Sequence, residues 1–179
     1  TGILWKESYV SPAAADFDND GLVDFFISTF YEKDESVLYR NEGGFKFSDV
    51  TTQVHVHSKE TYQAAWADFD NDGFMDLVTG GHLFRNLGNK NSWLKIKLIS
   101  KKSNAMAIGA RVVVELPTGE KFLRQVETGT GSGNQNNSTL HFGLGAFHGE
   151  AVGLTVIFPS GAALKGMVQP NHVIEVTEN

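Results

Sequence analysis

The chain has 179 residues, which is enough for one or two domains with a sizeable core. Its 21 acidic and 15 basic residues give a formal net charge of −6, and they leave no basic patch of the kind that binds nucleic acid. Cysteine is absent, so no disulfide stabilises the fold. No apolar run is long enough to span a membrane, no signal peptide is visible, and a chain that starts at Thr1 is expected to be processed or excised.

A nine-residue acidic motif occurs twice, at residues 16–24 and at residues 68–76. In both copies aspartates occupy positions one, three, five and nine, and the same Phe, Asn and Gly stand between them. Four carboxylates in so short a loop repel one another by about 1 to 4 kcal/mol per close pair, depending on local screening. The sequence therefore predicts a bound cation at each motif; the alternative is an acidic surface turn that holds no ion.

Calcium suits this set of ligands better than other cations. It accepts six to eight oxygen ligands in flexible geometry, whereas magnesium demands a tight octahedron and zinc prefers the Cys and His ligands that both motifs lack. The glycine at position six permits a sharp bend, and the carbonyl of the next residue is the expected main-chain ligand. The two predicted sites comprise Asp16, Asp18, Asp20, Leu22 and Asp24, and Asp68, Asp70, Asp72, Phe74 and Asp76.

These loops differ from an EF-hand, which needs a bidentate Glu at position twelve and a helix on either side. Position twelve is Ile27 in one copy and Thr79 in the other, and neither side chain chelates calcium. The flanking segments are apolar and rich in aromatic or β-branched residues, which favours strands. We expect each calcium loop to join two strands, at residues 10–15 and 25–30 in the first copy and at 63–67 and 77–79 in the second.

The similarity between the two copies extends beyond the motifs. Residues 38–43 (LYRNEG) align with residues 83–88 (LFRNLG), and the charged segment 31–36 of the first copy predicts a longer surface turn. Repeats of this length built from short strands are typical of propeller blades, and closure needs at least about four blades. The chain is thus expected to be part of a longer propeller, to close against its own second domain, or to complete its sheets with neighbouring copies.

The two motifs resemble the FG-GAP or VCBS type of calcium-binding repeat, which is found in integrin-like β-propellers and in many secreted bacterial proteins. The resemblance implies that the motif aspartates are side-chain ligands that hold together the hairpin between adjacent strands of a blade. Their implied role is structural.

The second half of the chain shows strand patterning. Apolar and charged residues alternate in 94–98, and with one slip in 111–115, which predicts half-buried antiparallel strands. The Pro-Thr-Gly and Pro-Ser-Gly tripeptides at 117–119 and 159–161 predict turns. About seven strands are enough for a small β-sandwich. The remaining predicted strands are residues 120–127, 139–142, 152–158, 163–168 and 172–177.

Residues from about 91 onward resemble the ASPIC/UnbV domain, which follows such repeats in the cartilage acidic protein family. The matching segments are 103–111, 140–145 and 158–161, although the family usually has Trp where Phe158 stands. We therefore expect an all-β chain with two domains. Residues 1–90 would form two calcium-binding repeats of an incomplete propeller, and residues 91–179 would form an ASPIC/UnbV-like sandwich.

These observations predict a secreted, calcium-stabilised structural or adhesive module that acts through protein or matrix contacts. An extracellular or cell-surface location suits loops of this type, because extracellular modules bind calcium with dissociation constants of about 10⁻⁴ to 10⁻³ M. One alternative is a self-assembling subunit of an extracellular filament or matrix, joined through unpaired sheet edges. Another is a carbohydrate-binding module that uses the polar loop 129–137 and an exposed Trp. No catalytic or cofactor-binding residue is predicted, because the remaining acidic residues are scattered.

Overall fold

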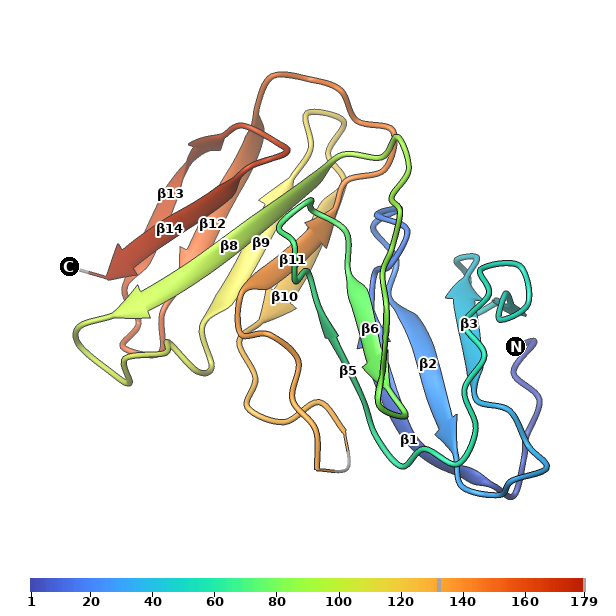
Figure 1. Ribbon diagram of the computed structural model, residues 1–179. Coiled ribbons are helices and arrows are strands. Elements are labelled where there is room, and N and C mark those ends of the chain that lie inside the picture. The colour runs from blue at the N-terminus through green and yellow to red at the C-terminus, as the bar shows by residue number, and fades with distance from the viewer. Residues whose placement is uncertain (132, 179) are drawn as a thin grey trace. The chain divides into compact units, whose positions relative to one another are not determined.

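The computed structural model describes residues 1–131 and 133–178, and this part of the chain is all-β (Figure 1). It contains no helix long and apolar enough to cross a membrane. The strands form four open sheets, which confirms the predicted class of propeller-type repeats followed by a sandwich. Contacts divide the described residues into a first unit of 1–18, 22–88, 129–131 and 133–136 and a second unit of 19–21, 89–128 and 137–178. The domain division at residue 90 stays a prediction.

The first repeat forms a four-stranded antiparallel sheet in the first unit, with its strands in sequential order. The first predicted calcium loop joins its first two strands, as the sequence predicts. The charged segment 31–36 is part of the connection to the third strand. The strands are β1 (Tyr9–Ala15), β2 (Asp24–Thr29), β3 (Val37–Asn41) and β4 (Phe47–Asp49).

The second repeat forms a sheet of three strands, β5 (Ala64–Ala67), β6 (Asp76–Thr79) and β7 (His82–Phe84). By alignment of the two repeats, residues 92–94 correspond to β4, but they lead into the first strand of the second unit, β8 (Trp93–Ser100). Within the described residues β7 therefore pairs with β6 alone. The outer edge of this sheet is open.

A shared core joins the two repeats. Phe26 and Leu38 of the first sheet and Trp66 and Leu77 of the second are all at most 3 % exposed and belong to one apolar cluster. The Trp66 indole Nε1 also donates a hydrogen bond to the Ala13 carbonyl oxygen at 3.1 Å. The pair of repeats thus behaves as one packed body.

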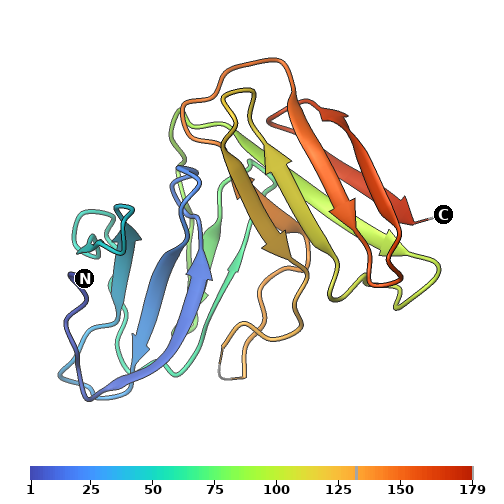
Figure 2. The same ribbon diagram turned by 180° about the vertical axis from the view of Figure 1, so that it is seen from behind.

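The second unit is a β-sandwich in which every strand predicted for it is present. One sheet has the order β10-β9-β12-β13 and the other has the order β11-β8-β14. In Figure 2 the sheet that contains β9 and β12 faces the viewer. The strands besides β8 are β9 (Arg111–Glu115), β10 (Lys121–Gln125), β11 (Leu140–Gly143), β12 (Val152–Ile157), β13 (Ala163–Val168) and β14 (Val173–Glu178).

One strand pair departs from the predicted antiparallel arrangement. β14 pairs with β8 in parallel, with Val173 opposite Lys95 and Glu178 opposite Ser100. The reason is topological: the chain crosses from β13 in one sheet to β14 in the other, so no tight hairpin fixes the direction of β14. The alternating pattern of a strand reports which faces are buried and does not report the direction of its neighbour.

The sandwich core lies between the inner faces of the two sheets. Val112 and Val156 from one sheet and Ile96 and Phe142 from the other are fully buried and belong to a single apolar cluster. Phe158, which stands where the resembling family usually has Trp, is 2 % exposed and packs in the same cluster. Its role is therefore to fill the core.

Candidate metal centres

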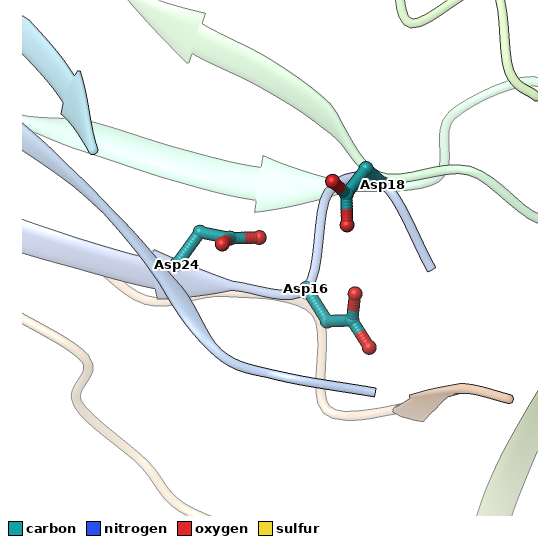
Figure 3. A group of neighbouring side chains, drawn as sticks. All are labelled: Asp16, Asp18 and Asp24. Carbon is teal, nitrogen blue, oxygen red and sulfur yellow. The ribbon is translucent and has the colours of Figure 1, made fainter. Parts of the chain in front are cut away.

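Three carboxylates of the first motif converge on one point (Figure 3). Asp16 follows β1, Asp24 begins β2 opposite Ala15, and Asp18 lies in the loop between them. Each offers a carboxylate oxygen, and these three atoms lie within 4.8 Å of one another. Asp16 and Asp24 are at most 3 % exposed, so their charges have lost most of their contact with water.

The second motif repeats this arrangement at the equivalent positions. Carboxylate oxygens of Asp68, Asp70 and Asp76 also lie within 4.8 Å of one another. Asp68 and Asp76 are buried, and Asp76 begins β6 opposite Ala67 of β5. Two separate segments of sequence therefore produce the same cluster of three carboxylates.

The backbone of each loop turns through two residues with positive φ. The glycines at position six, Gly21 and Gly73, have φ of 94° and 91°, which agrees with the predicted bend. The asparagines at position four, Asn19 and Asn71, have φ of 58° and 60°, and asparagine tolerates this left-handed region better than most residues. The repeated Asn, to which the sequence analysis gave no role, is therefore part of the turn geometry.

The aspartate at position nine also braces its loop. Asp24 accepts hydrogen bonds from the Asn41 amide at Oδ1 (2.8 Å) and from the Phe17 amide at Oδ2 (3.1 Å). Asp76 accepts the equivalent bonds from Asn86 (2.8 Å) and Phe69 (3.0 Å). Each of these carboxylates thus ties the start of its loop to the end of the third strand of its repeat: Asn41 is the last residue of β3, and Asn86 lies two residues beyond β7.

Asn41 and Asn86 are structural residues of the sites that sequence reasoning missed. The Asn41 side chain donates to the Val23 carbonyl oxygen at 3.0 Å and accepts from the Gly43 amide at 2.9 Å. Asn86 has the equivalent bonds, to the Met75 carbonyl oxygen at 3.2 Å and from the Gly88 amide at 3.0 Å. The signal was the repeated Arg-Asn-x-Gly segment, which was used only to align the copies.

Burial raises the pKa of Asp24 from 3.8 to about 8, and the neighbouring Asp18 and Asp16 carboxylates add to the rise. The hydrogen bonds from Asn41 and Phe17 act in the opposite direction. Burial raises the pKa of Asp76 as well, with Asp70 and Asp72 contributing. A nearby cation removes the cause of both shifts, because it offsets the cost of an ionised, desolvated carboxylate.

The position-five aspartates lie outside the converging groups of three. Asp72 instead accepts a hydrogen bond from the Phe74 amide at 3.0 Å. Residues 19–21, which include Asp20, are grouped with the second unit, in which the Gly145 amide donates to the Asn19 carbonyl oxygen at 2.8 Å. That Asp20, Asp72 and the carbonyls of Leu22 and Phe74 also bind the ion stays a prediction.

The chemistry of these clusters fits calcium. All the converging ligand atoms are carboxylate oxygens, with no nitrogen or sulfur ligand in either group, which is the preference of a hard cation. Further oxygens lie in the same loops at Asp20 and Asp72, and calcium has the coordination number to accept them.

Comparison with known families agrees with both halves of the chain. Residues 16–79 match the FG-GAP-like repeat, and residues 100–179 match the ASPIC and UnbV family. The chain thus combines a region that matches FG-GAP-like repeats with a region that matches the ASPIC and UnbV family. It is similar to cartilage acidic protein 1 from Mus musculus, at 28 % identity over 91 % of this chain, and from Xenopus tropicalis, at 28 % identity over 92 % of this chain. The Homo sapiens protein is 28 % identical over 90 % of the chain.

The chain spans only part of the length of these relatives. It corresponds to 28 % of the length of the Mus musculus and Xenopus tropicalis proteins and to 27 % of that of the Homo sapiens protein. The residues that match the two family models include both candidate metal centres and most of the sandwich.

Proposed function

We propose that the chain is a calcium-stabilised structural or adhesive module that acts through protein or matrix contacts outside the cell. The observation that carries the proposal is the pair of carboxylate clusters, Asp16, Asp18 and Asp24 and Asp68, Asp70 and Asp76, at equivalent places in the two repeats. A bound calcium ion would supply the positive charge that these desolvated groups need. No reaction is assigned to either cluster.

Some residues of each site would bind the ion, and one of them also stabilises the loop. The aspartates at positions one and three present oxygens to the ion, and the aspartate at position nine does so while it also accepts two backbone amides. An ion held between them would fix the end of β1 against the start of β2, and the end of β5 against the start of β6. The strands that build the shared core are thereby kept in register.

The extracellular location rests on affinity and on similarity. Loops of this kind in extracellular modules need calcium of about 10⁻⁴ to 10⁻³ M. The similarity to proteins named for cartilage favours a role in an extracellular matrix.

The test is thermal unfolding and sedimentation velocity of one sample, first in millimolar calcium and then in chelator. We expect calcium to raise the melting temperature and millimolar magnesium to raise it much less. The double variant Asp18→Asn/Asp70→Asn should lose most of the calcium effect. An equal melting temperature in calcium and chelator would overturn the proposal.

Self-assembly is a second candidate function, and the open outer edge of β7 favours it. Beside that edge the first unit has a largely apolar groove of about 580 Å³, lined by Leu83, Phe84 and Leu87 among others. An unpaired strand beside an apolar groove is a template for another strand. Large species that appear in calcium and vanish on chelation would support a filament subunit, and a monomer at high concentration would exclude it.

The structure gives less support to the carbohydrate-binding alternative. The side chains of Asn134 and Asn136, in the polar loop, donate to the backbone of β5 and β1, so they are not directed at a ligand. Trp66 is buried, and Trp5 alone among the three tryptophans is highly exposed, at 81 %. A glycan array with no hits would remove this candidate.

A further inference from the structure

The polar loop that follows β10 packs against the repeats. Residues 129–131 and 133–136 belong to the first unit, although the chain on both sides of them builds the sandwich. Gly131 shows how close the approach is, because a Cβ at this position would lie 2.7 Å from Ser11 Oγ and 2.8 Å from the Pro12 carbonyl oxygen. Only glycine allows the loop to lie this near to β1.

Asn136 bonds to both repeats with one side chain. Its Nδ2 donates to the Ala14 carbonyl oxygen of β1 at 3.0 Å, and its Oδ1 accepts from the Trp66 amide of β5 at 3.0 Å. Among the described residues β1 and β5 each pair with one strand only, so these groups lie on strand edges that the ladders do not use. The side-chain amide of Asn136 therefore takes the place of a neighbouring strand at both edges.

The two residues that Asn136 joins occupy equivalent positions in the repeats. Ala14 stands two residues before Asp16, and Trp66 stands two residues before Asp68, which are the first aspartates of the two motifs. The loop holds Asn136 in place, because its amide donates to Thr130 Oγ1 at 2.9 Å and the Thr130 amide donates to the Asn134 carbonyl oxygen at 3.2 Å. One fixed side chain thus bonds to the two strands that lead into the calcium loops.

We propose that Asn136 is a positioning residue that couples the two calcium sites. This inference rests on the proposed binding of calcium. When an ion fixes Asp16, it also fixes Ala14 two residues earlier; Asn136 then holds the Trp66 amide, and the backbone that leads to Asp68 is set before the second ion arrives. Positive coupling of this kind between two sites typically corresponds to about 5- to 150-fold in affinity.

The test isolates the first site and observes the second repeat. In an Asp70→Asn background, which removes a ligand of the second site, amide hydrogen exchange is measured at Trp66 with and without calcium. We expect calcium at the first site to slow exchange of the Trp66 amide at least fivefold when Asn136 is present, and to have no effect in Asn136→Ala. The exposed neighbour Gln135 offers the matched control, since Gln135→Ala should behave as the parent chain.

A second variant separates the two bonds and guards against misfolding of the first. Asn136→Asp keeps an acceptor for the Trp66 amide and loses the donor to Ala14, so Trp66 should stay protected while its response to calcium disappears. Calorimetric titration of the chain with its native aspartates should show two sites whose coupling is lost in both variants.

The outcomes distinguish this inference from the proposed function. Calcium binding at both sites with coupling unchanged in Asn136→Ala and Asn136→Asp would overturn the role of Asn136 and leave the calcium sites standing. No calcium binding by the native chain would overturn both. Loss of the calcium response at Trp66 in these two variants, but not in Gln135→Ala, would support the coupling.

Discussion

Arg85 Nε lies 2.7 Å from Asp70 Oδ2, so an ion pair is already formed with a member of the second carboxylate cluster. Its Nη2 also lies 3.6 Å from Asp72 Oδ2. The equivalent arginine of the first repeat, Arg40, pairs with Glu42 at 2.6 Å. In the second repeat a guanidinium charge therefore lies directly beside the carboxylate cluster.

We expect Arg85→Ala to raise the calcium affinity of the second site, since the guanidinium repels the incoming ion and holds Asp70. An exposed ion pair of this kind is worth about 0.2 to 1 kcal/mol, so the gain should be roughly 1.5- to 5-fold. Calorimetric titration would measure it, with Lys97→Ala, which removes an exposed ion pair to Glu175 in the sandwich, as the control that leaves both sites unchanged. A fall in affinity in Arg85→Ala would show that Arg85 orients Asp70 for the ion.

Stability should depend on pH more strongly without calcium than with it. Without the ion the pKa of Asp24 is about 8 in the folded chain and near 3.8 in the unfolded chain, so the folded state holds an extra proton between these values. Stability in chelator is therefore expected to fall as pH rises from about 4 to about 8. Calcium removes this loss because it stabilises the ionised carboxylate.

The difference in melting temperature between calcium and chelator should accordingly grow from pH 5 to pH 8. Below the pKa of Asp24 the calcium ion must displace a proton. The apparent calcium affinity should therefore rise by up to about tenfold for each unit that the pH increases. Thermal scans at four pH values in the two conditions would measure this. A difference that is constant across the range would contradict the role given to Asp24.

Trp66 should contribute to stability through one polar bond as well as through packing. Trp66→Phe removes the Nε1 donor and with it the buried hydrogen bond to the Ala13 carbonyl oxygen, which costs about 0.5 to 1.5 kcal/mol, and the smaller ring adds a cavity. Trp5→Phe is the control, and because Trp5 is 81 % exposed it should change stability by less than about 0.5 kcal/mol. Denaturant unfolding would give both values, and equal values would be inconsistent with this bond.

Local patterns predicted most of the strands and the carboxylate clusters, because both depend on neighbours in sequence. The alternation in 94–98 and the Asp spacing in 16–24 are signals of this kind. The parallel pairing of β14 with β8, and the bonds of Asn136 to Ala14 and Trp66, join segments about 70 to 120 residues apart. No periodicity predicts such a contact, which is why the sequence indicates the polar loop 129–137 only as a candidate carbohydrate-binding loop.

The last prediction concerns Asn86 and Asn41, which are equivalent residues with unequal contacts. Asn86 Nδ2 donates to the Phe17 carbonyl oxygen at 2.7 Å, and Phe17 lies between Asp16 and Asp18 in the first calcium loop. Asn41 makes no corresponding bond that the described residues show; its Nδ2 reaches only Val23 of its own repeat. The side chain of the second repeat thus supports the calcium loop of the first.

We therefore expect Asn86→Ala to destabilise the chain by about 1 kcal/mol more than Asn41→Ala, which is the value of one additional hydrogen bond. Asn86→Ala should also weaken calcium binding at the first site, whereas Asn41→Ala should leave the second site unchanged. Denaturant unfolding in calcium and calorimetric titration would measure the two effects. If the second site weakened in Asn41→Ala as much as the first site in Asn86→Ala, the asymmetry inferred from the bond to Phe17 would be wrong, because support between the loops would then run equally in both directions.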